Sequence, residues 1–252
     1  MLDTLLSLGA SSAGARPKAM IQVNDSNSII HGTQKLQDGY EHYMVKFASI
    51  TDTHEIGKIE YIYSLMAKKA GLDMPKTKLL HTKTNSYFAI KRFDRESDDK
   101  IHIHSVAGLT HSDYRFPSLD YDDLLTLTLH LTKDFKEQQK MFRLAVFNLF
   151  THNRDDHAKN FSFLLKKNQW YLSPAYDLTF SFGPGGEHST TYLGEGRIPT
   201  IEHLNLLAKK HNIKNVSTMI QEVQEAVSMF EKFAKDVGLS VKLIAEYKNQ
   251  LL

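Results

Sequence analysis

The segment from residue 153 to residue 160, NRDDHAKN, places two aspartates, a histidine, a lysine and two asparagines in a short run after the apolar stretch MFRLAVFNLF. Asp155 and Asn160 stand in it as D-x-x-x-x-N. Protein kinases use this spacing, because a carboxylate must orient the attacking hydroxyl while an amide oxygen reaches a magnesium ion on the phosphates. The spacing selects Asp155 as the base, and we interpret Asp156 as a turn or capping residue.

This spacing alone is a weak signal, but other residues follow the order that kinases use. Lys46 lies in the strand-like run YMVKFA, Glu60 in the helix-like segment after it, and Asp177 in AYDLT beyond the loop. A buried strand lysine needs an acidic partner, and we expect Glu60 to be that partner, with Glu55 as its competitor. Asp177 and Asn160 supply hard oxygen ligands of the kind that Mg²⁺ binds.

A loop of small residues, SSAGARPK at positions 11–18, precedes all of these residues. Its backbone N–H groups are expected to cover phosphates. The loop matches neither the G-x-x-x-x-G-K-[ST] pattern nor the G-x-G-x-x-G pattern. The predicted order is therefore a phosphate loop, a strand lysine, a helix glutamate, a catalytic aspartate and a metal-binding aspartate.

The elements that must position these residues can be predicted from hydrophobic periodicity and turn residues. Strands are expected at 19–23, 41–48, 77–82 and 86–94, helices at 54–70, 121–132, 137–152 and, in several pieces, 200–252, two short strands around the turn at 166–169, and a loop at 182–188. A strand-rich first part and a helix-rich remainder favour an α+β fold with a cleft between two lobes. We expect an N-lobe over residues 1–93 and a C-lobe over residues 94–252.

Composition excludes several classes of function. The chain has 252 residues, which suits one bilobal unit, and its formal net charge of +2 is too small to argue for nucleic acid or an acidic membrane as a direct partner. The absence of cysteine excludes disulfides and thiolate metal sites and is consistent with a reducing cytosol. Neither a signal peptide nor a membrane span is expected.

The motifs SSAGARPK, YMVKFA, IKRFDR, NRDDHAKNFSF and PAYDL together resemble the HipA family of bacterial serine/threonine kinases, the toxins of toxin–antitoxin modules. The resemblance covers roughly residues 9–180 and implies a protein-kinase-like fold with a small β-rich N-lobe and a helical C-lobe. It also implies ATP and Mg²⁺ as cofactors, a translation-related protein substrate such as an aminoacyl-tRNA synthetase, and a HipB-like DNA-binding antitoxin as partner.

Carried onto these positions, the resemblance implies that Asp155 is the catalytic base, that Asn160 and Asp177 bind Mg²⁺, and that Glu60 plays a supporting part. The hinge at residues 91–93 would offer backbone groups to adenine. The implied ATP-binding residues are Ser12, Ala13, Gly14, Ala15, Lys46, Lys91, Phe93, His157, Lys159 and Tyr176. Autophosphorylation is implied at Ser11 or Ser12, and the two adjacent serines leave the choice open.

This sequence departs from the HipA pattern in two further ways. Full-length HipA carries an N-terminal subdomain before the loop, and only a short stretch precedes it here, which resembles the split HipBST arrangement of a HipT toxin with a separate HipS-like protein. In place of the family's RLHQED this sequence has KIHIHSV. His102 and His104 alternate on one strand face, and a structural or polar-pocket role is preferred because a zinc site would need further ligands.

Two alternatives to a protein kinase stay open. Kinases of small molecules such as aminoglycosides use related D-x-x-x-x-N loops, and a nucleotide-binding regulator would hold partners without transferring phosphate. The loop at 182–188 serves either as a segment that docks substrate or as a linker. The resemblance implies a bacterial cytoplasmic protein and leaves secretion into a host open.

Overall fold

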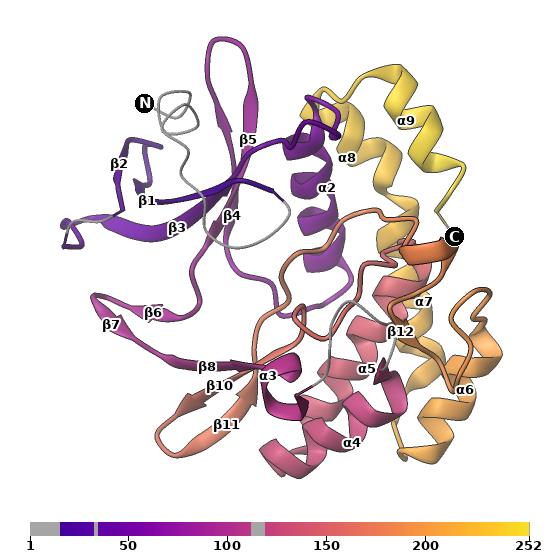
Figure 1. Cartoon of the computed structure of the whole chain (residues 1–252). Helices are drawn as coiled ribbons and strands as arrows, with labels where there is room; N and C mark the ends of the chain where they lie inside the picture. Colours follow the sequence, from indigo (N-terminus) through magenta and orange to yellow (C-terminus); the bar gives the residue numbers. More distant parts are fainter. Residues whose placement is uncertain (1–15, 33–34, 112–118, 252) are drawn as a thin grey trace.

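The computed structural model describes residues 16–32, 35–111 and 119–251 (Figure 1). The predicted loop residues Ser11, Ser12, Ala13, Gly14 and Ala15 lie outside the described residues. Strands dominate the first part of the chain and helices the second, so the expected α+β class is confirmed. The boundary between the lobes at residue 93 stays a prediction.

A five-stranded antiparallel sheet forms the N-terminal part, with the strand order β2-β1-β3-β5-β4. The strands are β1 (Lys18–Asn24), β2 (Ile29–His31), β3 (Tyr40–Lys46), β4 (Thr77–His81) and β5 (Ser86–Lys91). Alternating residues such as Ile21, Tyr43 and Val45 are fully buried and form the core of this sheet. Lys46 ends β3, paired with Lys18 on one side and Phe88 on the other.

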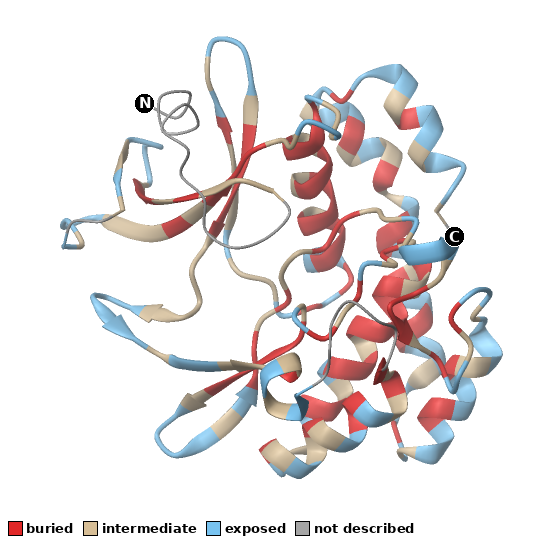
Figure 2. Ribbon diagram, in the orientation of Figure 1, coloured by how far each residue is buried: buried red, intermediate tan, exposed pale blue. Residues whose placement is uncertain are grey.

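Helix α2 (Ile56–Lys69) lies between the sheet and the C-terminal helices (Figure 1). At Gly57 a Cβ atom would lie 2.5 Å from the carbonyl oxygen of Ser86, so glycine is needed for the close approach to β5. The buried residues Ile59 and Tyr63 nevertheless belong to the core of the C-terminal helices. Figure 2 shows buried residues along most of α2.

The helical part surrounds one large core. Its helices are α3 (Val106–Thr110), α4 (Tyr121–Thr132), α5 (Phe135–Phe150), α6 (Ile201–Lys210), α7 (Val216–Ser228), α8 (Phe230–Val237) and α9 (Val241–Lys248). Asp134 caps α5 by accepting from the N–H of Lys136, and α5 ends directly before the NRDDHAKN segment. No helix in the described part of the chain is both long and apolar enough to cross a membrane.

A three-stranded sheet with the order β11-β10-β8 joins two strands that follow that segment to one that precedes it. Its strands are β8 (His102–Ser105), β10 (Ser162–Lys166) and β11 (Gln169–Leu172). The predicted turn is present, and Lys167 and Asn168 both adopt positive φ angles, of 50° and 60°, as in a type I′ hairpin turn.

The remaining elements are short. They are β6 (Arg95–Glu96), β7 (Asp99–Lys100), β9 (Leu119–Asp120), β12 (Thr190–Thr191) and a 3₁₀ turn over Pro184–Gly186. Strand β12 pairs with β9 in parallel and begins just after the predicted loop at 182–188.

Candidate active site

Lys46 joins two carboxylates that come from distant parts of the chain. Its ammonium donates to Glu60 Oε1 at 2.8 Å and also contacts Asp177 Oδ1, and the lysine side chain is only 5% exposed. Burial alone would lower the pKa of Lys46, but the charges of Asp177 and Glu60 outweigh it and raise that pKa. In return, Lys46 lowers the pKa of Asp177 to about 2. The structure thus brings together the predicted lysine, its helix partner and the second predicted metal ligand.

The backbone at Asp177 is left-handed, with φ at 56°. Most residues with a side chain avoid this region, and aspartate is among the few that tolerate it. The preceding residue, Tyr176, is fixed by its hydroxyl, which donates to the carbonyl oxygen of Lys159 at 2.6 Å and accepts from Ser162 Oγ at 2.6 Å. The chain therefore turns sharply at the point where the carboxylate meets Lys46.

Arg16 is a charged neighbour of this cluster that the sequence did not indicate. Its guanidinium donates from Nε and Nη2 to the two oxygens of Asp52, at 2.9 and 2.8 Å, and from Nη1 to Glu60 Oε1 at 3.1 Å. Burial would raise the pKa of Asp52, but its hydrogen bonds with Arg16 and Ser49 hold it at about 2. Arg16 ends the predicted phosphate loop, yet nothing in the sequence links it to an acid 36 residues away.

Asp155, the predicted catalytic base, lies beside the same cluster. Asp155 has a side chain that is 56% exposed, and its carboxylate lies 3.8 Å from His157 Nε2. Desolvation raises the pKa of Asp155, and the nearby His157 opposes this effect. Asn160 Nδ2 donates to the carbonyl oxygen of Asp155 at 2.7 Å, which leaves the amide oxygen of Asn160 as the atom suited to a cation.

A cavity of about 220 Å³ is lined by Lys46, Asp155 and Asp177 together, and Asn160 is not among its lining residues. Its charged lining residues are Arg16, Lys18, Lys46, Asp52, Asp155 and Asp177. Typical small-molecule sites measure roughly 300–1,000 Å³, so the size of this cavity suits a polyphosphate better than a whole nucleotide. One carboxylate from Asp177 and one amide from Asn160 form a donor set that fits Mg²⁺ sharing its shell with phosphate oxygens.

Two backbone N–H groups of the predicted hinge already have partners. The backbone N–H groups of Lys91 and Arg92 donate to carbonyl oxygens of Lys76 and His42, both at 2.8 Å, and the Lys91 ammonium is paired with a glutamate. These two N–H groups are therefore occupied within the sheet. Phe93 lies closer to the predicted nucleotide site, because its ring centroid is 5.5 Å from that of Tyr176.

Asp156 differs from its predicted role as a turn or capping residue. It is 1% exposed, and its carboxylate accepts hydrogen bonds from the Tyr121 hydroxyl at 2.8 Å and from the Thr190 N–H at 3.2 Å. His188 Nδ1 lies 2.9 Å from the same carboxylate. The expectation failed because these three partners come from 32 or more residues away, beyond the reach of any local pattern.

The two histidines of the HIH segment lie on β8 with ring centroids 6.3 Å apart. The His102 ring also meets the edge of Trp170 at 5.6 Å. In residues 16–32, 35–111 and 119–251, no group of three or more His, Cys, Asp or Glu side chains is placed to hold a metal ion. Aromatic packing accounts for the position of His102.

The chain was compared with known proteins. The model of the HipA-like C-terminal domain matches residues 10–234. A Haemophilus influenzae protein named as a kinase is 24% identical over 255 residues, which cover 94% of this chain and 70% of that protein. The serine/threonine-protein kinase toxin HipA of Shewanella oneidensis is 24% identical over 190 residues, which cover 66% of this chain and 42% of the toxin.

Solved structures of kinases share the fold. HipA of Shewanella oneidensis, solved with HipB and operator DNA, aligns with a TM-score of 0.69 at 18% identity, over 96% of this chain and 63% of that one. The Helicobacter pylori proinflammatory kinase CtkA aligns with a TM-score of 0.53 at 15% identity, over 84% of this chain and 85% of that one. Because the family model matches most of its length, this chain belongs to the HipA-like C-terminal domain family.

Proposed function

We propose that this chain is an ATP- and Mg²⁺-dependent kinase that transfers a phosphoryl group to a serine or threonine hydroxyl of a protein. The observation that carries the proposal is the contact of Lys46 with both Glu60 and Asp177, beside Asp155 in one charged cavity. Residues separated by up to 131 positions meet there. Relatives that are named kinases support the same reading.

Each residue has a part in the proposed reaction. Lys46 binds the phosphates and is held by Glu60, while Asp177 and Asn160 hold Mg²⁺, which neutralises charge on the transferring group. Asp155 orients the attacking hydroxyl and accepts its proton, for which its exposed carboxylate is accessible. Arg16 adds a second fixed positive charge at the cavity. Positioning and electrostatics then account for most of the catalysis.

Asp155→Asn tests this proposal. The change keeps the shape of the side chain but removes the base, so we expect phosphoryl transfer from radiolabelled ATP to fall by about 10²–10⁴-fold. The matched control is Asp236→Asn, an exposed aspartate on α8, which should keep wild-type activity. Transfer at the wild-type rate by the Asp155 variant would contradict the assignment.

The assay should offer two kinds of acceptor. Bacterial proteins and the chain itself serve as one set, and aminoglycosides serve as the other. Labelling of proteins supports the proposal, and labelling of a small molecule alone would replace it with the small-molecule alternative. Binding of ATP without transfer to any acceptor would favour the nucleotide-binding regulator.

We extend the proposal to the biology of the family. The chain would act as the toxin of a toxin–antitoxin system, modify a translation-related protein, and modify itself on Ser11 or Ser12. A HipB-like antitoxin is proposed as a partner, since the Shewanella relative is solved with HipB and DNA. A separate HipS-like protein would complete the short HipT form. Mass spectrometry of the purified chain separates Ser11 from Ser12.

A further inference from the structure

The inner side of the catalytic loop is fastened by a buried polar cluster centred on Asp156. Tyr121, His188 and Thr190 all contact its carboxylate. The hydroxyl of Tyr121 accepts in turn from Asn148 Nδ2 at 2.9 Å, so the cluster reaches back into α5. All of these side chains are 2% exposed or less. Three hydrogen-bond donors share this one buried carboxylate. Removing the carboxylate would leave each donor buried without its partner, which costs free energy.

The segment at 186–190, which comes after Asp177 in the chain, packs along the loop that carries Asp155. The N–H and hydroxyl of Ser189 both donate to the carbonyl oxygen of Arg154, each at 3.1 Å. The Thr190 hydroxyl donates to the carbonyl oxygen of Asp156, and the Arg154 guanidinium contacts the carbonyl oxygen of Gly186. The backbone is therefore held on both sides of Asp155.

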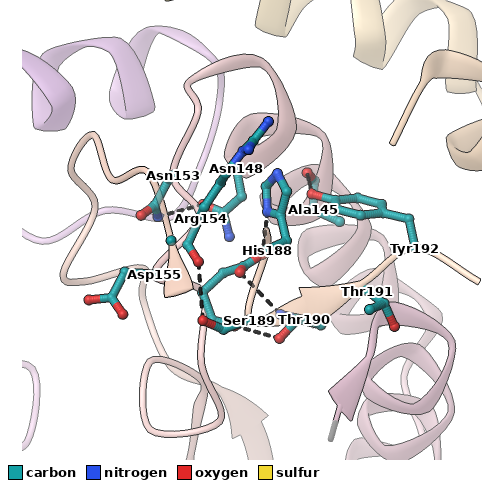
Figure 3. Close-up of polar contacts among 12 residues, drawn as sticks. Ala145, Asn148, Asn153, Arg154, Asp155, His188, Ser189, Thr190, Thr191 and Tyr192 are labelled. Atoms are coloured by element: carbon teal, nitrogen blue, oxygen red, sulfur yellow. Dashed lines mark hydrogen bonds and ion pairs between the residues drawn. The ribbon is translucent and has the colours of Figure 1, made fainter. Parts of the chain in front are cut away.

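Asp155 itself points away from this cluster. Figure 3 shows its carboxylate directed away from His188 and Thr190, while the carbonyl group of Arg154 meets Ser189. Adjacent aspartates thus have opposite environments, with Asp155 56% exposed and Asp156 1% exposed. Fixing the buried aspartate fixes the direction in which its neighbour faces.

We propose that Asp156 and His188 are positioning residues, which clamp the 188–190 segment onto the catalytic loop and so hold the Asp155 carboxylate in the cleft. This inference rests on the proposed kinase function. Neither residue lines the cavity that contains Lys46 and Asp177, so the clamp acts through Asp155 and not by contact with a ligand there. Misplacing a catalytic group by about 1 Å can cost on the order of 10²-fold in rate.

Three variants test the clamp. Asp156→Asn keeps the volume but turns one accepting oxygen into a donor. His188→Leu removes the ring nitrogen that meets Asp156, whereas His188→Asn keeps a donor close to the position of Nδ1. We expect Asp156→Asn and His188→Leu each to lower kcat by about tenfold or more, while the KM for ATP stays within about twofold. His188→Asn should recover most of the wild-type kcat.

A double variant shows whether the two residues act as one unit. Asp156→Asn combined with His188→Leu should lose about as much kcat as the more damaging single change. Thermal unfolding checks that each variant is folded at the assay temperature. If Asp156→Asn is unfolded at that temperature, the two His188 variants alone test the clamp.

Three outcomes overturn the clamp. They are a wild-type kcat in His188→Leu, a loss in kcat matched by an equal loss of affinity for ATP, and losses that multiply in the double variant. Each of them leaves the proposed function standing if the wild-type chain transfers phosphate. A wild-type chain with no transfer removes the proposed function and the clamp together.

Discussion

At the scale of single residues, the charges in the cleft determine one another's protonation. Lys46 contacts Glu60 and Asp177, and Arg16 contacts Glu60 from a second direction. The side chain of Asp177 is 37% exposed, so its charge is partly screened, yet Lys46 still keeps its pKa at about 2. Part of the pH dependence of the fold's stability should therefore be traceable to one lysine.

We expect the free energy of unfolding to fall as the pH is lowered from about 5 to about 2. An aspartate in an unfolded chain has a pKa of roughly 3.9, so in this window the unfolded state binds more protons than the folded state does. The stability that the lowered pKa of Asp177 contributes is fully present above about pH 5 and is lost as the pH falls to about 2. Lys46→Met removes the cause of that contribution and should make the dependence less steep, while the contribution of Asp52, which Arg16 holds, stays.

Urea unfolding at a series of pH values measures how steeply the free energy of unfolding changes with pH in the wild type and in Lys46→Met. Lys232→Met is the matched control, because Lys232 is exposed on α8, away from the cleft. The control should keep the wild-type slope. Equal slopes for wild type and Lys46→Met would show that the contact between Lys46 and Asp177 does not contribute to the loss of stability at low pH.

Several site residues could be predicted from the sequence because the kinase order constrains them strongly. Lys46 and Glu60 were expected to pair, and the structure places them 2.8 Å apart. Arg16 was not indicated, since its partners Asp52 and Glu60 depend on how the sheet and α2 meet. Asp156 was misjudged for the same reason, because its donors come from separate elements.

At the scale of elements, the segment from Ser181 to Tyr192 is shaped by a glycine. Gly183 has a φ of 71°, and a Cβ atom there would lie 1.9 Å from the carbonyl oxygen of Glu187 and 2.7 Å from the Cβ of Arg154. Gly185 has a φ of 65° but no atom within 4 Å of such a Cβ. The two glycines share a left-handed backbone, which would be strained for other residues, and differ in the space around them.

We therefore expect Gly183→Ala to disturb the catalytic loop more than Gly185→Ala does. Both variants pay for the positive φ, roughly 1 kcal/mol, but only the first forces Arg154 or Glu187 to move. Thermal unfolding and kcat are the measurements, and Gly183→Ala should be lower in both. Indistinguishable behaviour of the two variants would mean that this segment adapts without strain.

Local signals explain which elements could be predicted. The helices over residues 54–70 and 121–132 and the hairpin at 166–169 appear near their expected places, because periodicity and turn residues act over short distances. The helix expected at 137–152 begins at Phe135 and ends at Phe150. The pairing of β8 with β10 was not predicted, since it joins strands about sixty residues apart.

At the scale of the whole molecule, α2 belongs to the β-rich part by its position in the chain and to the helical part by its packing. Its chain position lies within the β-rich part, but its buried face packs into the core of the C-terminal helices. The sheet has a separate small core of its own. We therefore expect α2 to unfold with the helices and not with the sheet.

A pair of valine variants tests this division. Val45 lies in the core of the sheet and Val223 in the core shared by α2 and α7, and both are buried. Each change to alanine should cost roughly 1–3 kcal/mol. By hydrogen exchange, Val45→Ala should release β1, β3 and β5 and leave α2 protected, whereas Val223→Ala should release α2. Loss of protection in α2 with Val45→Ala would contradict the division.

The side chains around the cleft also sum to a small excess of negative charge. Among the described residues, Arg16, Lys18 and Lys46 supply three positive charges, while Asp52, Glu60, Asp155 and Asp177 supply four negative ones. A free polyphosphate, itself strongly anionic, would meet net repulsion here, whereas one that carries a divalent cation would not. Under the proposed function, the acids that would hold the metal would also let the cleft favour metal-complexed over uncomplexed nucleotide before any chemistry begins.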